Sequence, residues 1–377
     1  MSMKRIISIF MTMIILMLSC VVATANSFVD SNTNQNAFML TETCPQDVVD
    51  FAKTSIDSFP YMNEYANSQI VLGEPFTLTN EKINNTVYYF PVIIDGEIEY
   101  TYRIFYSNGW QYVLSECLAD ELNYAAEHST ITAPTIIYLN DDDNIVVQNQ
   151  NYESIFVVES VSDNVIASST SEILPYSEAI VKLKENKTTK TINSFSSIKV
   201  VDDSTASTYS AKASSAKSKY LSPTIREQQG SLPWCAAYVT AFIVSYKTGT
   251  AYYAREVAQF AGASESEGIS ISKCVKFAKD KGLSNTRQTI FDASDNTMMK
   301  QIDNNCPVYV GANNKNTDGS HALAVIGYSW SGSAITNWRI WNPWYNSFEN
   351  ISSREYTAPN GYEYEEWEYF IIDFNND

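Results

Sequence analysis

Residues 228–239 read QQGSLPWCAAYV, and this stretch decides the fold of the second half of the chain. A turn rich in Gly, Ser and Pro leads into Cys235. Residues 236–246 are apolar almost all round, and the Lys, Thr and Gly at 247–249 are C-terminal helix signals. Because a helix that is apolar on all sides is buried at the centre of a domain, we predict a central helix headed by Cys235.

A cysteine at the start of such a helix is suited to nucleophilic chemistry. Free backbone N–H groups and the positive end of the helix dipole meet at a helix N-terminus, and both stabilise a thiolate. The other interpretation is that Cys235 is a small core residue, which composition alone favours. The choice depends on which other residues the chain can supply for catalysis.

His321 is the only histidine in the second half of the chain. It follows a polar turn at 318–320 and precedes an apolar run at 322–326. A polar turn that is followed by an apolar run is typical of the beginning of a buried strand. We therefore predict that His321 lies at the mouth of a strand.

Asn342 ends a second apolar run, residues 338–341, and begins a turn at Pro343 that is flanked by two tryptophans. A short strand over 338–341 would deliver the amide into that turn. A tryptophan beside the amide, such as Trp344, would screen its hydrogen bonds from water.

Together these residues supply the groups that thiol catalysis needs. A thiolate nucleophile requires an imidazole as general base and acid, and a third group that fixes the imidazole tautomer through its other nitrogen. Cys235, His321 and Asn342 occur in that order. Gln229 lies six residues before Cys235, so its amide can point at a developing oxyanion, with the Cys235 N–H as second donor.

Three motifs resemble the staphopain group of secreted bacterial papain-like cysteine proteases. They are residues 225–238 (IREQQGSLPWCAAY), 321–327 (HALAVIG) and 341–346 (WNPWYN). The motifs fall in the family's order and at similar spacing, and the resemblance covers roughly residues 215–377.

The resemblance implies an α+β protein with a papain-like catalytic domain, made of a helical half and a β-barrel-like half. It implies that Cys235 is the nucleophile, His321 the general base and acid, and Asn342 the residue that orients the histidine. Gln229 would be the oxyanion donor and Trp344 the shield of the His–Asn pair. It also implies a secreted endopeptidase, made as a zymogen, that cleaves proteins or peptides through a Cys acyl-thioenzyme.

The chain divides by composition into four segments. Residues 1–25 carry a short basic stretch, an apolar run and an Ala-Thr-Ala site, which predict a secretory signal peptide and an extracellular protein. Residues 26–202 are strongly acidic, 203–219 form a Ser/Ala/Thr/Lys-rich linker or processing region, and 220–377 form the catalytic domain. An N-terminal membrane anchor is the alternative for the first segment, but its apolar run is short for a span.

Charge separates the two large segments. Residues 26–211 have a balance of −18 and residues 212–377 a balance of −2. Under the resemblance, the acidic segment takes the place of a propeptide, and we expect it to inhibit the catalytic domain.

Apolar alternation in the acidic segment predicts an α+β, strand-rich prodomain. Asp95 and Gly96 mark a hairpin between two of its strands. We expect helices at 47–65 and 118–126, and strands at 86–94, 97–106, 109–114, 136–139, 144–148, 154–158 and 179–183. In the catalytic domain, residues 363–374 alternate as a half-buried strand would.

Five cysteines follow residue 25, and an odd number leaves at least one thiol free. Disulfides between Cys274 and Cys306, or between Cys44 and Cys117, remain open. Cys274 and Cys306 are otherwise expected to be core residues.

Composition also excludes several classes of function. A net charge of −18 disfavours binding to nucleic acid or anionic membranes. Two histidines and the absence of a Cys-x-x-Cys pair exclude a zinc finger or a three-histidine zinc hydrolase. We expect no cofactor, no metal, no stable membrane anchor and a monomer whose partners are its substrates and its own prodomain.

Three other functions remain open. A cell-wall peptide amidase or peptidase also uses a helix-borne cysteine and a strand-borne histidine. A non-catalytic binding protein could keep the fold, although it would usually have lost one of the four polar site residues. A bacteriocin-processing domain is disfavoured, because its transporter partner needs transmembrane helices that this chain lacks outside its N-terminal apolar run.

Overall fold

The computed structural model describes residues 38–40, 44–56, 65, 68–129, 134–156, 173–186, 190–192, 217–290, 294–332 and 334–376. We refer to the described residues up to 192 as the N-terminal half and to those from 217 as the C-terminal half. The predicted signal peptide and most of the predicted linker lie outside the described residues. In the part of the chain that is described, no helix has the length and apolarity of a membrane span.

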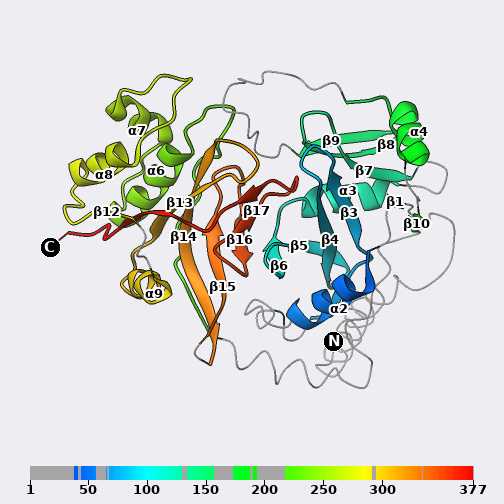
Figure 1. The fold of residues 1–377 in the computed structure, drawn as a ribbon, viewed down its shortest axis with the longest axis horizontal. Helices are drawn as coiled ribbons and strands as arrows, with labels where there is room; N and C mark the ends of the chain where they lie inside the picture. The colour runs from blue at the N-terminus through cyan, green and yellow to red at the C-terminus, as the bar shows by residue number, and fades with distance from the viewer. Residues whose placement is uncertain are drawn as a thin grey trace, which may run out of the picture. The chain divides into compact units, whose positions relative to one another are not determined.

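Antiparallel strands dominate the N-terminal half, as predicted (Figure 1). Asp95 and Gly96 have positive φ angles of 52° and 100°, and they form the predicted tight turn between β4 and β5. The first strands are β2 (Ile70–Leu72), β3 (Phe76–Asn80), β4 (Asn85–Ile94), β5 (Glu97–Tyr106) and β6 (Trp110–Ser115).

A second sheet in this half has the order β10-β1-β7-β8-β9. Its strands are β1 (Phe38–Leu40), β7 (Thr135–Leu139), β8 (Ile145–Asn149), β9 (Tyr152–Phe156) and β10 (Lys190–Ile192). The helices of this half are α2 (Gln46–Ser55), α3 (Ala119–His128) and α4 (Tyr176–Asn186).

Two expectations for this half need correction. The strand expected at 179–183 is wrong, because these residues belong to α4, whose Tyr176, Ala179 and Ile180 pack on Ile136 at helical spacing. The first helix ends at Ser55, well before residue 65. Its buried face carries Val48 and Ala52, and residues 57–64 lie outside the described part.

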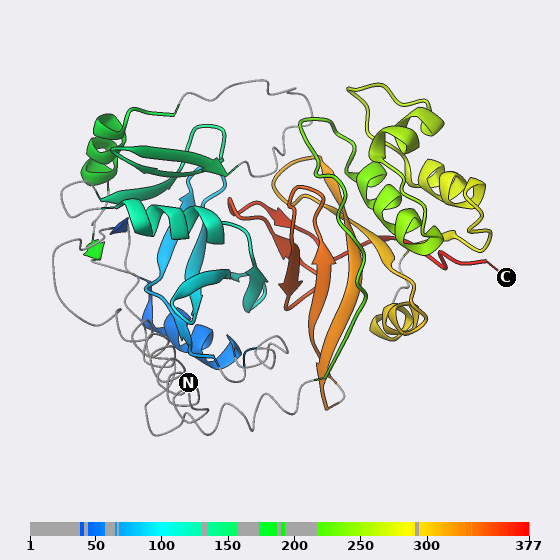
Figure 2. The same cartoon turned by 180° about the vertical axis from the view of Figure 1, so that it is seen from behind.

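The predicted central helix of the C-terminal half is confirmed. It is α6 (Cys235–Thr248), it ends at Gly249 with a left-handed φ of 73°, and nine of its residues are buried. It packs against α7 (Ala254–Ala261), α8 (Ile271–Asp280) and the sheet strands β13 and β14. Figures 1 and 2 show α6, α7 and α8 grouped on one side of these strands. The fourth helix of this half is α9 (Asp295–Asp303).

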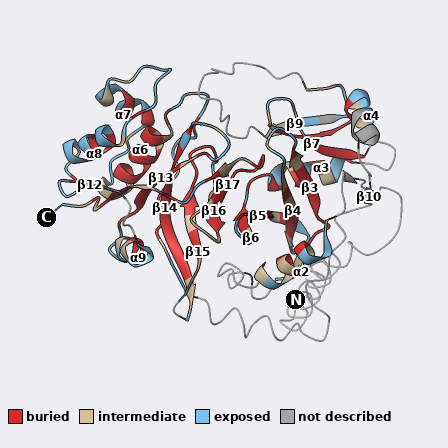
Figure 3. Ribbon diagram, viewed as in Figure 1, coloured by how far each residue is buried: buried red, intermediate tan, exposed pale blue. Residues whose placement is uncertain are grey.

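Antiparallel strands form the rest of the C-terminal half, and their inner faces are buried (Figure 3). Residues 363–374 form two strands rather than the single strand expected. Trp367, which is buried, lies between the two. The strands are β11 (Lys217–Tyr220), β12 (Arg287–Ile290), β13 (Val308–Asn313), β14 (Ser320–Ser331), β15 (Ala334–Trp341), β16 (Phe348–Ile351), β17 (Tyr356–Thr357), β18 (Glu363–Tyr364) and β19 (Tyr369–Ile372). This mixture of helices and antiparallel sheet agrees with the predicted α+β class.

One sheet runs through both halves of the chain. Its 12 strands include the path β12-β19-β13-β14-β15-β16-β6-β5-β4-β2. The two halves meet where β16 pairs antiparallel with β6, with Glu349 opposite Ser115 and Ile351 opposite Val113. Sequence patterns did not predict this join, because any two edge strands offer the same backbone groups.

Neither of the two disulfides left open by the sequence is formed, since all five described cysteines are free thiols. Burial raises the pKa of Cys117 and Cys274 to about 12 and that of Cys306 to about 11. These thiols therefore stay protonated and unreactive at neutral pH.

Gly327 lies where β11 pairs with β14, and the close approach of β11 requires a residue without a side chain there. It lies opposite Tyr220, and a Cβ at this position would come 2.3 Å from Tyr220 Cδ1 and 2.8 Å from the Lys219 carbonyl oxygen. We expect Gly327→Ala to lower the free energy of unfolding by about 1–3 kcal/mol, because the tyrosine ring must move. Urea denaturation would measure this change, and Gly268→Ala is the control, since its Cβ would meet only Pro233 O at 3.7 Å. Equal effects of the two substitutions would contradict the expectation.

Candidate active site

Cys235 is the first residue of α6, as predicted. Trp234 anchors the first turn of this helix. Its carbonyl accepts the N–H of Ala237 at 2.8 Å and that of Tyr238 at 3.0 Å. The first turn of the helix contains no acidic residue, so no nearby carboxylate opposes a thiolate there. The Cys235 side chain is half-buried and packs on the core of the C-terminal half.

Gln229 ties the loop before Cys235 to the loop after Asn342. Its backbone N–H donates to the Pro343 carbonyl at 2.7 Å, and its side-chain Nε2 donates to the Leu232 carbonyl at 2.9 Å. The side chain is buried, and its Oε1 has no hydrogen-bond partner among the described residues. The hydrogen bond to the Leu232 carbonyl therefore fixes the orientation of the Gln229 side-chain amide.

His321 and Asn342 come together at the ends of two neighbouring strands. His321 is the second residue of β14, and Asn342 directly follows β15, which pairs with β14. His321 Nε2 lies 2.9 Å from Asn342 Oδ1, and both side chains are buried. The ring of Tyr364 contacts the imidazole, with 5.8 Å between ring centroids.

The hydrogen bonds around Asn342 determine the histidine tautomer. Asn342 Oδ1 also accepts the Trp344 N–H at 3.1 Å, and Asn342 Nδ2 donates to the Tyr356 hydroxyl at 3.1 Å. With the amide oxygen facing the imidazole, His321 Nε2 must carry a hydrogen. In the neutral ring, Nδ1 is then the nitrogen that can accept a proton.

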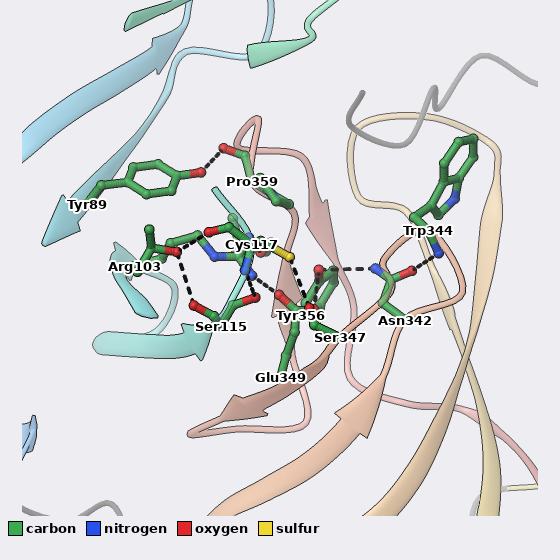
Figure 4. A network of polar contacts seen from close by, with 12 residues as sticks. Tyr89, Arg103, Ser115, Cys117, Asn342, Trp344, Ser347, Glu349, Tyr356 and Pro359 are labelled. Atoms are coloured by element: carbon green, nitrogen blue, oxygen red, sulfur yellow. Dashed lines mark hydrogen bonds and ion pairs between the residues drawn. The ribbon is translucent and has the colours of Figure 1, made fainter. Parts of the chain in front are cut away.

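Trp344 contacts Asn342 through its backbone. In Figure 4 its indole extends away from the Asn342 amide. The side chain is 9% exposed, and it packs with Tyr345 and with Cys117 of the N-terminal half. Its role as a shield stays a prediction, whereas Tyr356 and Tyr364 are the aromatic residues in contact with the pair.

Sequence reasoning missed the residues behind Asn342. Tyr356 donates its hydroxyl hydrogen to Glu349 Oε2 at 2.9 Å, and Glu349 forms an ion pair with Arg103 from β5 of the N-terminal half (Figure 4). The glutamate is fully buried and the arginine is 1% exposed. The sequence offered no signal for this pair, because residues 348–351 read FENI and are half polar.

No three His, Cys, Asp or Glu side chains are grouped as metal ligands would be, in the part of the chain that the structure describes. The polar groups that the structure brings together here are instead an imidazole, an amide and a tyrosine hydroxyl.

Comparison with known proteins identifies a family and relatives that this chain resembles. Residues 216–371 match the family model described as staphopain peptidase C47. The resemblance to the staphopains is thereby confirmed. Staphopain A of Staphylococcus aureus, from strains Mu50 and N315, is 26% identical to this chain over 331 residues. The matched region covers 81% of this chain and 79% of each staphopain A chain.

The staphopain match includes all five predicted site residues, from Gln229 to Trp344. The family description and the relatives' names indicate a cysteine-type endopeptidase. The aligned region is longer than the family model's match, so the similarity to staphopain A extends into the N-terminal half.

Proposed function

We propose that this chain is a secreted cysteine endopeptidase, made as a zymogen, whose Cys235, His321 and Asn342 hydrolyse peptide bonds in proteins. The observation that carries the proposal is the buried contact of 2.9 Å between His321 Nε2 and Asn342 Oδ1. His321 lies on β14, against which α6 packs, and α6 begins with Cys235.

In the acylation step, the Cys235 thiolate attacks the carbonyl carbon of the scissile peptide bond. A C–S bond forms, and the carbonyl electron pair moves onto oxygen. We assign the oxyanion donors as the Cys235 N–H and the Gln229 side chain, which its two hydrogen bonds hold near the cysteine loop. As the C–N bond breaks, the Nδ1–H of His321 protonates the leaving amine.

In the deacylation step, neutral His321 takes a proton from water through Nδ1. The hydroxide attacks the thioester, the C–S bond breaks, and the acid product leaves with the thiolate regenerated. Asn342 acts throughout by accepting the Nε2 hydrogen, which keeps Nδ1 free for proton transfer.

The N-terminal half is proposed as the inhibitory prodomain. Its strand β6 extends the sheet of the C-terminal half, and its Cys117 packs against Trp344 and Tyr345 beside Asn342. It also bonds the loop around residue 360, with the Asn80 side chain donating to the Asn360 carbonyl at 3.0 Å. Attachment this close to the His–Asn pair supports control of the site by the prodomain.

The decisive experiment compares residues 26–377 as wild type and as Cys235→Ala. Both are incubated with reductant, their intact mass is followed, and casein is added. We expect the wild type to shorten and to digest casein, and the variant to do neither, because the acylating sulfur is absent. Cys306→Ala is the matched control, since this buried thiol lies outside the proposed site, and it should behave as wild type.

Digestion of casein by Cys235→Ala would refute the proposal. A wild-type chain that leaves casein intact but releases peptides from cell walls would favour the cell-wall peptidase instead. If the wild type does not shorten by itself, cleavage within 203–219 by an added protease followed by the casein assay separates processing from catalysis.

A further inference from the structure

Five buried polar side chains form a continuous chain of contacts from the N-terminal half to the proposed catalytic histidine. Figure 4 shows this chain from Arg103 as far as Asn342. Arg103 pairs with Glu349 Oε1, and Glu349 Oε2 accepts the Tyr356 hydroxyl at 2.9 Å. The Tyr356 oxygen accepts from Asn342 Nδ2 at 3.1 Å, and Asn342 Oδ1 lies 2.9 Å from His321 Nε2. Every member is less than 5% exposed.

The direction of each hydrogen bond in this chain is determined by the ionised end. A carboxylate can only accept, so Tyr356 must donate its single hydrogen to Glu349. The tyrosine oxygen is then left as an acceptor, which selects the NH₂ side of the Asn342 amide. The amide oxygen must consequently face His321. A reversed amide would place an NH₂ group against both the imidazole N–H and the Trp344 N–H.

Arg103 is the cation that faces the Glu349 carboxylate where the two halves join. Burial lowers the pKa of Arg103, but attraction to Glu349 and to the neighbouring tyrosines together outweighs that effect and raises the pKa well above its usual range. Arg103 is therefore a permanent cation beside the carboxylate. It also donates to the Thr357 carbonyl at 3.4 Å, and its guanidinium lies 5.9 Å from the centre of the Tyr356 ring.

Burial also keeps Tyr356 neutral, because it raises the pKa of the phenol well above its usual range. The hydroxyl hydrogen is thus present at neutral pH. The chain consequently transmits orientation rather than protons from Glu349 to His321.

We propose that Tyr356 and Glu349 are positioning residues, which hold the Asn342 amide in the orientation that the His321 imidazolium requires. This inference rests on the proposed function and assigns two residues to it that the sequence motifs do not contain. Arg103 supplies the counter-charge for Glu349 in the full chain, so the N-terminal half completes the network from behind the site.

The test is the reaction of Cys235 with iodoacetamide in the full chain at pH 5 and pH 8, followed by mass spectrometry of the Cys235 peptide. A thiol held with an imidazolium stays reactive at pH 5, and an ordinary thiol does not. For Tyr356→Phe, we expect the ratio of the pH 5 rate to the pH 8 rate to fall about tenfold relative to wild type, because Asn342 loses one orienting bond. Casein hydrolysis should show a similar fall in kcat with little change in KM.

Tyr328→Phe is the matched control. Tyr328 is also a buried tyrosine that donates to a carboxylate, Asp303 Oδ1, at 2.9 Å, but it lies outside the chain of contacts. Tyr328→Phe should leave both the ratio of the pH 5 rate to the pH 8 rate and kcat unchanged. Glu349→Gln is the second variant: the carboxylate accepts from Arg103 and from Tyr356 through different oxygens, and a single amide oxygen cannot do both, so its ratio should also fall below that of wild type.

If the wild-type chain reacts at pH 5 and a folded Tyr356→Phe variant has the same ratio of the pH 5 rate to the pH 8 rate, the positioning role alone is overturned. Should Tyr356→Phe not fold, a Glu349→Gln ratio equal to wild type would overturn it in the same way. A wild-type chain that fails to react at pH 5 would overturn both this inference and the proposed thiolate–imidazolium chemistry.

Discussion

His321→Ala is expected to lower kcat for peptide hydrolysis by roughly 10⁴- to 10⁶-fold. The imidazole carries every proton in the proposed cycle, and its Nε2 is already committed to Asn342 at 2.9 Å. No other histidine can take its place, because His128 is exposed and bonds to the Tyr124 carbonyl at the end of α3. KM should change little, because the imidazole acts on the reacting atoms rather than on the rest of the substrate.

The matched control is His128→Ala, which removes the second histidine of the chain and should retain wild-type kcat. Imidazole added to the buffer should restore a small part of the activity of His321→Ala, because it can enter the space that the ring leaves. A variant that kept more than about a tenth of the wild-type kcat would contradict the assigned role, since proton transfer alone contributes at least 10²-fold.

Arg103→Met should destabilise the full chain by about 3–5 kcal/mol, because it leaves Glu349 buried without its counter-charge. Methionine keeps most of the arginine's volume, so the loss reports on charge rather than on a cavity. Urea unfolding should be measured in a Cys235→Ala background, which prevents self-cleavage. Adding Glu349→Gln to Arg103→Met should recover more than half of the loss, because the uncompensated charge is then absent.

Lys82→Met provides the comparison. Lys82 pairs with Asp143 at 2.9 Å, but its side chain is 53% exposed, so we expect a change below about 1 kcal/mol. If Arg103→Met cost no more than Lys82→Met, the buried pair would not be a principal link between the halves.

Local patterns were enough to predict the elements that carry the site. The apolar run after Cys235 predicted α6, and the polar turn before His321 predicted the start of β14. The residues that hold one another in place were harder to predict. Glu349 lies in a short strand that reads FENI, and its partner Arg103 is 246 residues away in the sequence. Spacing within a motif contains no information about such a contact.

The wrong strand at 179–183 shows the complementary limit of local patterns. Ile180 and Val181 are β-branched and favour strands, but Tyr176, Ala179 and Ile180 bury one helical face on Ile136. Tertiary packing therefore outweighed local propensity there. Hydrogen-bond direction around Asn342 was also beyond prediction, because it depends on the Tyr356 hydroxyl, which lies on a different strand.

The join between β6 and β16 has a consequence for the order of folding. The paired residues, such as Ser115 and Glu349, are far apart in the chain, so closing this contact costs more conformational entropy than any neighbouring hairpin. The N-terminal half is synthesised first, and its β6 edge can serve as a template on which β16 adds as one more strand. Cleavage after folding would then leave a catalytic half that no longer has its template. Once denatured, it should refold slowly, with the newly exposed edge of β16 prone to aggregation.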